Sequence, residues 1–197
     1  MVIGVGVSAL GTHDQIKNLA QPGPEDRFSP KSMFGDVIRA FAIPSFTAVV
    51  TASIIAGMSQ GMVQALIIYT GTYFFELSPN QMTFLFTGGV VGVVTGTLLT
   101  RPLSSIFKEK KHLYIAGHCW YAIFTSYVII LRLMDLLPPN SDPLIAPLYI
   151  ISGTISGIGL GAAIPLTSSM IADVTDEHER RYKRRQEGIY YAAASFA

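Results

Sequence analysis

Long stretches without a charged side chain restrict the fold of this chain more than any other feature. One stretch runs for 36 residues from Ala40 to Phe75, and another for 30 residues from Pro143 to Ala172. A helix needs about 20 mainly apolar residues to cross a bilayer, and an uncharged soluble core helix of this length would be very unusual. The pattern predicts an all-α fold, a polytopic transmembrane helix bundle with complete spans at about 43–75, 81–100, 112–131 and 143–172.

The composition favours the same class of protein. Half of the 197 residues are hydrophobic and 14% are charged, whereas soluble domains carry roughly 25% charged residues. The mean hydropathy is +0.42. The net charge of +1 gives no sign of a nucleic-acid partner. A single cysteine, Cys119, excludes a disulfide framework within the chain.

Three further segments complete the predicted organisation. Residues 1–12 are apolar, but twelve helical residues reach only about 18 Å, so we interpret them as the end of a truncated transmembrane helix. Residues 13–42 are polar and contain turn-forming proline and glycine, which indicates a connector. Residues 188–197 start a further span. The expected bundle over residues 43–197 therefore belongs to a chain with four complete spans and two partial ones.

The basic residues alternate between the connectors. Of the 14 lysines and arginines, four lie in residues 13–42, four in 101–111 and five in 173–187, and only Arg132 lies elsewhere. Basic residues collect on the cytoplasmic side of membrane proteins. The distribution therefore predicts that these three connectors are cytoplasmic and that the turns near residues 76–81 and 132–142 lie on the opposite side.

Polar residues inside the predicted spans are the first candidates for function. Ser53, Gly57, Gln60 and Gln64 share one face of the first complete helix, where polar groups face either a cavity or another helix. Two interpretations follow, a cavity-lining stripe or hydrogen-bonded helix packing, and both stay open. His118 in the third span also has two interpretations: a proton carrier, since histidine titrates near neutrality, or a residue that makes a structural hydrogen bond or lies near the headgroups.

Two glycine ladders have transmembrane rather than nucleotide-binding spacing. In each ladder, glycine recurs at every fourth residue, so its members lie on one helix face and let a neighbouring backbone approach closely. The pattern predicts helix packing for Gly88, Gly92, Gly96, Gly153, Gly157 and Gly161.

No enzyme motif is present in the sequence. The chain lacks HExxH, a phosphate-binding loop, GxSxG and a paired-cysteine metal site. The acidic residues around His178 are consecutive, so they do not converge on one helix face as metal ligands would. We therefore expect no catalytic residue, no metal site and no cofactor.

The segment after the fourth span carries a more specific pattern. It follows A-D-V-x-D-x-x-E and, after a gap, R-x-E-G, at Ala172, Asp173, Val174, Asp176, Glu179, Arg185, Glu187 and Gly188. This segment resembles the glycoside–pentoside–hexuronide:cation symporters, the melibiose-permease-like branch of the major facilitator superfamily. It departs from the family pattern at Thr175 and at Tyr182–Lys183, which affects the expected turn of the loop.

The resemblance implies an organisation for the whole transporter. The family has twelve spans in two halves, and this chain is similar to the end of span six, spans seven to ten and the start of span eleven. The coupling cation, Na⁺ or H⁺, and most sugar-binding residues are then expected in the missing N-terminal half. The complete spans agree with this, because none has an interior carboxylate.

The resemblance also implies roles for single residues. Spans seven, eight, ten and eleven would line the cavity, which makes Gln60, Gln64 and Tyr69 the cavity candidates. The candidates for a cytoplasmic ion-pair gate are Asp173, Asp176, Arg185 and Glu187, with anchoring of the loop as the alternative.

The expected function is a fragment of a cation-coupled sugar or glycoside symporter that works by alternating access in a bacterial cytoplasmic membrane. Its partners would be a small sugar, the bilayer and the other half of the transporter. Two alternatives are transport of another solute, such as a lysophospholipid, and a non-transporting, truncated membrane protein.

Overall fold

The computed structural model divides the chain into two units, residues 1–37 and 38–197. The residues that it describes are 11, 35, 38, 41–107 and 109–182. The predicted partial spans at 1–12 and 188–197 and most of the predicted connector at 13–42 lie outside this part. All of the fold discussed below belongs to the second unit.

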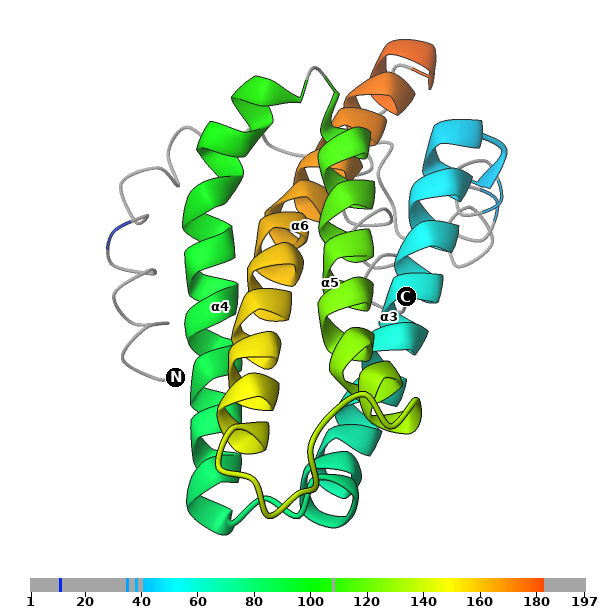
Figure 1. The fold of residues 1–197 in the computed structure, drawn as a ribbon. Helices are drawn as coiled ribbons and strands as arrows, with labels where there is room; N and C mark the ends of the chain where they lie inside the picture. Colours follow the sequence, from blue (N-terminus) through cyan, green and yellow to red (C-terminus); the bar gives the residue numbers. More distant parts are fainter. Residues whose placement is uncertain (1–10, 12–34, 36–37, 39–40, 108, 183–197) are drawn as a thin grey trace. The chain divides into compact units, whose positions relative to one another are not determined.

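Helices make up the described part of this unit (Figure 1), and none of its residues forms a strand. The first helix, α3 (Pro44–Tyr69), continues directly into a π-helical turn, η2 (Thr70–Phe74). Three further helices follow: α4 (Pro79–Ile106), α5 (Lys110–Leu133) and α6 (Ile145–Tyr182). In the described part of the chain, four helical segments are long and apolar enough to cross a membrane, which confirms the predicted fold class.

Two helices extend past the predicted ends of their spans. α4 passes through Arg101 and Pro102 to Ile106, and α6 continues beyond Ala172 to Tyr182. The sequence predicts the end of each span at the first charged residue, but a helix can continue beyond the hydrocarbon core of the membrane. The backbone hydrogen bonds of a helix are satisfied internally, so its passage into a polar medium requires no break.

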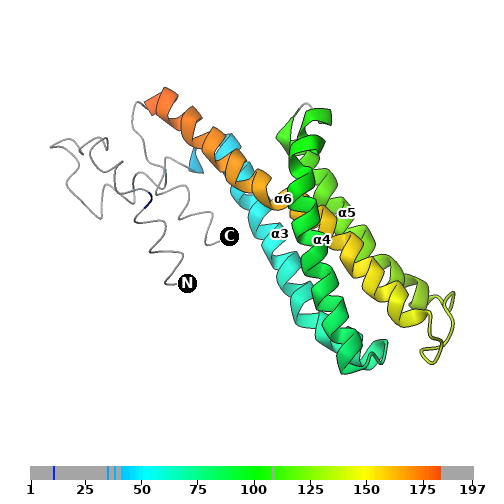
Figure 2. The ribbon, with the colours of Figure 1, turned by 90° about the vertical axis from the view of Figure 1, so that its left-hand side faces the viewer.

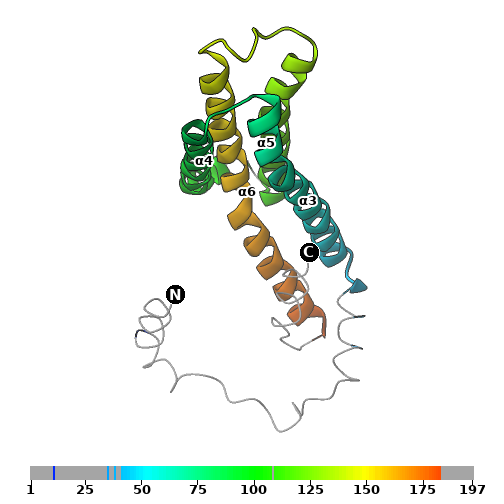
Figure 3. The same ribbon diagram turned by 90° about the horizontal axis from the view of Figure 1, so that it is seen from below.

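α6 is the central helix of the described unit. It packs against α4 on one side and α5 on the other, an arrangement visible in Figure 1 and, from below, in Figure 3. In its membrane-crossing window 44% of the residues are buried, against 11% in the window of α3 and η2. Among the described residues, α6 is therefore the most buried of the helices that could cross a membrane.

The contact between α4 and α6 brings two backbones together. A Cβ on any glycine of the two ladders would approach an atom of the facing helix to 3.0 Å or less. On Gly157, for example, it would lie 2.7 Å from the carbonyl oxygen of Gly89. Two hydroxyls join the same contact: Thr97 donates to the carbonyl of Gly161 at 3.1 Å, and Thr100 to that of Ala162 at 3.3 Å.

In the turn between η2 and α4, specific residues end the first helical segment and begin the next. Glu76 adopts a left-handed conformation with φ of 53°, which ends the preceding helical path. Ser78 then caps α4: its hydroxyl accepts from the Gln81 amide, while the Gln81 side chain accepts from the Ser78 amide. Pro79 occupies the first helical position, where its missing N–H has no cost.

α3 meets the rest of the unit mainly near its two ends. At its start, Ile43, Phe46 and Val50 form one apolar cluster with Ile171 and Val174 of α6, and Figure 2 shows the last turns of α6 beside the start of α3. Beyond its other end, Phe75 and Leu77 belong to a second cluster. Cavities occupy the space between the two clusters.

Candidate functional site

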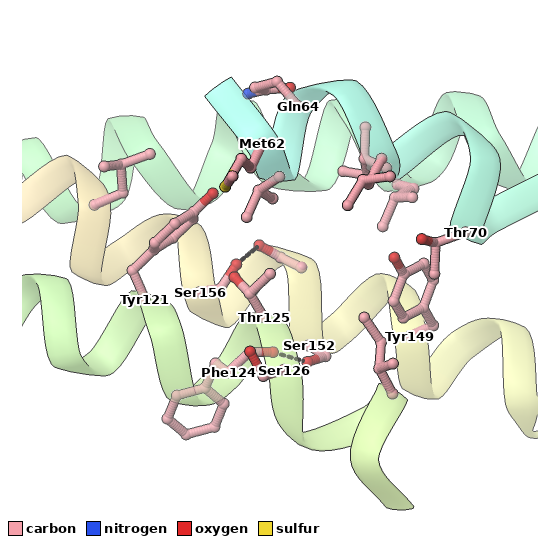
Figure 4. A pocket seen from close by; sticks show the side chains of 18 residues that line it. Met62, Gln64, Thr70, Tyr121, Phe124, Thr125, Ser126, Tyr149, Ser152 and Ser156 are labelled. Carbon is pink, nitrogen blue, oxygen red and sulfur yellow. Dashed lines mark hydrogen bonds between the residues drawn. The ribbon is translucent and has the colours of Figure 1, made fainter. Parts of the chain in front are cut away.

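One cavity among the apolar helices, here the central cavity, has a volume of about 250 Å³ and lies between α3, α5 and α6, with Thr70 of η2 and one residue of α4 also in its wall. No charged side chain lines it. Its polar lining consists of hydroxyl groups and one amide (Figure 4), contributed by Gln64, Thr70, Tyr121, Thr125, Ser126, Tyr149, Ser152 and Ser156.

Two serines of α6 donate hydrogen bonds to backbone carbonyls of the protein. Ser152 donates to the carbonyl of Phe124 and so links α6 to α5, and Ser156 donates to the carbonyl of Gly153 at 2.9 Å. Both serines are buried, with exposed fractions of 2% and 5%. Their oxygens keep lone pairs that can still accept a hydrogen bond.

Thr125 differs from these serines. Its hydroxyl oxygen is buried, and its neighbour is the side chain of Tyr121, one turn earlier on α5, rather than a backbone carbonyl. Figure 4 shows Thr125 on α5 facing the space beside Ser156.

A smaller cavity of about 160 Å³, here the His118 cavity, is lined by residues of the same three helices. Its polar side chains are Ser53, Gln60, Tyr114, His118 and Thr167. His118 Nδ1 lies 3.1 Å from the carbonyl oxygen of Tyr114. A neutral ring that donates from Nδ1 leaves Nε2 as an acceptor. Leu160 borders both cavities.

The three predicted cavity residues do not lie together. Gln60 lines the His118 cavity, and Gln64, one helical turn later, lines the central cavity. Tyr69 borders neither of these cavities; its side chain is 62% exposed and its ring lies 5.0 Å from that of Tyr73. Tyr69 lines neither cavity because it lies outside the helix face that Gln60 and Gln64 share.

The charged end of α6 is tied to two other helices. Asp173 pairs with Lys110 at the start of α5 at 2.5 Å, and Glu177 accepts a hydrogen bond of 2.9 Å from Ser45 near the start of α3. Asp176 is exposed. The other two gate candidates, Arg185 and Glu187, lie outside the described residues.

The connectors hold two more local charge contacts. Lys111 pairs with Glu109, and this contact lowers the pKa of the Glu109 carboxyl below its usual value of 4.5. Arg132, at the opposite end of α5, donates to the carbonyls of Leu137 and Pro138, so it orders the connector between α5 and α6.

Several of these residues were not identified from the sequence. Lys110 and Asp173 are 63 positions apart, so no local spacing predicts their pairing. Thr125, Ser152 and Ser156 are hydroxyl residues in apolar runs, and such residues usually bond to their own helix. The only signal in the sequence is their number on facing helices, which does not show which of them line a cavity.

The described residues contain no group of three or more His, Cys, Asp or Glu side chains that could hold a metal ion. Cys119 is a free, exposed thiol.

The fold and the cavities define a polytopic α-helical membrane protein with uncharged polar pockets inside the helix assembly. The chain belongs to the MFS/sugar transport protein family, whose model matches residues 1–197. This match confirms the resemblance to the glycoside–pentoside–hexuronide:cation symporters and identifies a transporter family rather than an enzyme family. Comparisons with curated proteins and with solved structures gave no match.

Proposed function

We propose that this chain forms part of the C-terminal half of a cation-coupled sugar symporter that works by alternating access. The observation that carries the proposal is the central cavity, an uncharged, hydroxyl-lined space enclosed by apolar helices in a chain of the MFS/sugar transport protein family. Hydroxyl groups both donate and accept hydrogen bonds, which suits a sugar better than an ion.

The coupling cation is assigned to the other half of the transporter. Neither the central cavity nor the His118 cavity has a carboxylate in its lining, and intramembrane ion sites are typically marked by ionisable side chains. The acidic residues of α6 lie instead near its charged end, at Asp173, Asp176, Glu177 and Glu179.

Polar contacts at that end of α6 are the proposed cytoplasmic gate. Asp173 and Glu177 connect α6 to α5 and α3 through single polar contacts. Exposed ion pairs contribute only about 0–1 kcal/mol each, so a conformational change can break and remake them at small cost. The alternative role, anchoring of the loop, requires these contacts to persist in every state of the transport cycle.

The test uses the full-length protein reconstituted in proteoliposomes. We expect uptake of radiolabelled D-galactose, D-xylose or a methyl glycoside to rise when an inward Na⁺ or H⁺ gradient is imposed, and to return to the basal rate when an ionophore collapses that gradient. If the sugar equilibrates across the membrane at the same rate with and without the cation gradient, the proposal of symport is contradicted. Uptake of lysophosphatidylethanolamine without uptake of any sugar would show that the cargo is a lysophospholipid rather than a sugar.

A further inference from the structure

We propose that His118 of α5 is a proton-binding site, and that water reaches it along a row of cavities that begins at the charged end of α6. This site goes beyond the proposed function, which assigns the coupling cation to the other half of the transporter. It is also independent of the cargo, because it concerns only a proton and the residues around one histidine.

Three cavities follow one another between α3 and the pair of α5 and α6. The first, here the charged-end cavity, has a volume of about 400 Å³. The His118 cavity lies next to it, because residues three or four apart are neighbours on a helix surface and the lining advances by one such step on every helix: from Val49 to Ser53 on α3, from Lys110 to Tyr114 on α5, and from Met170 to Thr167 on α6. Leu160 borders both the His118 cavity and the central cavity. The three cavities therefore form one row along the helices.

The two ring nitrogens of His118 have different surroundings. Nδ1 lies 3.1 Å from the carbonyl oxygen of Tyr114, whereas no described residue forms a hydrogen bond with Nε2. Nε2 is not a buried atom either, so it is open to the cavity that His118 lines. In the tautomer whose Nδ1–H donates to that carbonyl, Nε2 is the acceptor. A hydronium ion can transfer its proton to Nε2, which leaves water and an imidazolium with an N–H on both nitrogens.

The residues around His118 can solvate an imidazolium but cannot neutralise it. From α5, Tyr114 faces the ring at a centroid distance of 4.4 Å, and it is the only other titratable residue in the described lining. The polar residues from α3 are Ser53 and Gln60, and the one from α6 is Thr167; none of these three titrates. Their oxygens can accept a hydrogen bond from a protonated Nε2.

Water must reach a charged histidine at this depth. A charged side chain inside a membrane is costly unless it pairs with another charge or faces water, and no carboxylate lines the His118 cavity. The charged-end cavity provides the route, because Lys110 and Asp173 border it and their side chains are 43% and 58% exposed. Histidine changes its charge near neutral pH. The two interpretations of His118 therefore apply to different nitrogens, a structural hydrogen bond to Nδ1 and proton binding to Nε2.

The test measures the charge in the cavity with two thiol reagents, an anionic and a cationic methanethiosulfonate. They are applied to Gln60→Cys in the full-length protein in lipid nanodiscs, with all other cysteines replaced. Both reagents attack the same thiolate, so the ratio of their rates cancels its titration. Because a unit charge at about 6 Å in water changes the local concentration of a singly charged reagent about threefold, we expect the anionic-to-cationic ratio to rise about tenfold when the pH falls from about 8 to about 5.5.

Two histidine variants and a second thiol are the controls. Adding His118→Gln, which cannot take up a proton, should make the ratio independent of pH. Adding His112→Gln should leave the rise intact, because His112 is exposed and lines none of the three cavities. Cys119 is adjacent to His118 but is also outside these cavities, so a protein that keeps only this thiol should react slowly with both reagents. Ser53→Cys repeats the measurement if Gln60→Cys does not fold.

Three results would overturn the inference. A ratio that does not change with pH, or that rises equally with His118→Gln, would mean that His118 takes up no proton. Equal reaction of Cys119 and Gln60→Cys would mean that the row of cavities has no special access to water. Val49→Phe narrows the charged-end cavity and should slow both reagents severalfold at Gln60→Cys, so unchanged rates would contradict the route. Failure of the proposed function looks different, because sugar uptake would be absent while the ratio still followed the pH.

Discussion

Several polar side chains in the membrane-crossing helices bond to backbone carbonyls of a neighbouring helix. Trp120 donates to Ile155 across the α5–α6 contact at 2.8 Å, and Thr97 reaches Gly161 from α4. Such bonds satisfy the side chain and hold two helices together. The two interpretations of intramembrane polar residues, packing and cavity lining, therefore apply to different residues here.

The ion pair between Lys110 and Asp173 should contribute little to stability. Its side chains are 43% and 58% exposed, and exposed pairs are screened by solvent. In a double-mutant cycle of Lys110→Met and Asp173→Asn, we expect a coupling free energy of about 0.2–1 kcal/mol that declines as salt is added. Unfolding of the four proteins in mixed micelles measures it.

The pair of Lys111 with Glu109 serves as the comparison for that cycle, because its side chains are similarly exposed, at 62% and 54%. A coupling well above that of the comparison pair, or one insensitive to salt, would show that Lys110 and Asp173 are desolvated in the membrane.

Glu109 gives a pH dependence of known sign. Lys111 lowers the pKa of the Glu109 carboxyl from its usual value of 4.5, so the contact stabilises the folded state above that value and is lost as the pH falls through the lowered pKa. We expect the melting temperature of the parent protein to exceed that of Glu109→Gln slightly at pH 7. The difference should disappear in acid.

Lys111→Gln supplies the matching control for this pH effect, because it removes the partner and keeps the carboxyl. Its melting temperature should follow that of Glu109→Gln at pH 7. A difference that grows in acid would reverse the sign and exclude Lys111 as the cause.

At the scale of elements, the α4–α6 contact leaves no room for side chains at its glycines. A Cβ on Gly92 would meet the backbone of Thr154, whereas one on Gly89, three positions earlier on α4, meets nothing within 4 Å. We expect Gly92→Ala to destabilise the protein by about 1–3 kcal/mol, as overpacking does, and Gly89→Ala to leave stability nearly unchanged. Thermal unfolding in one detergent compares them directly, and equal melting temperatures would contradict the contact.

The elements were largely predictable because hydropathy acts locally. The uncharged run from Ala40 to Phe75 and the turn that follows it determine where α3 and α4 lie, within a few residues. The far ends of α4 and α6 were not predictable from charge, because Arg101 and Asp173 mark the membrane surface rather than the end of a helix. The π-helical turn at Thr70–Phe74 left no signal in the sequence.

The candidate site was less predictable than the elements. Gln60 and Gln64 stand out because amides are rare in apolar spans, and both border cavities. Thr125 and Lys110 gain their significance only from residues on other helices, and the distance between helices is not encoded in any one segment. A single sequence therefore indicated one wall of the central cavity and missed the wall formed by α5.

At the scale of the whole molecule, the charge distribution predicts the orientation in the membrane. In a Cys119→Ala background, Ser141→Cys places a thiol in the connector between α5 and α6, and Ser105→Cys places one near the end of α4, both at exposed positions. We expect a membrane-impermeant maleimide to label the first in intact cells and the second only after permeabilisation, as the positive-inside rule requires. Labelling of both from the same side would exclude the predicted topology.

The length of α6 has a mechanical consequence. A continuous helix of 38 residues measures about 57 Å at 1.5 Å per residue, roughly twice the thickness of the hydrocarbon core. The same helix carries Ser152 and Ser156 in the bilayer and Asp173 and Glu177 at its far end, with Pro165 inside it between the two pairs. An interior proline removes one backbone hydrogen bond, so we expect movement of the charged end to bend α6 at Pro165 and to reach the serines only in part.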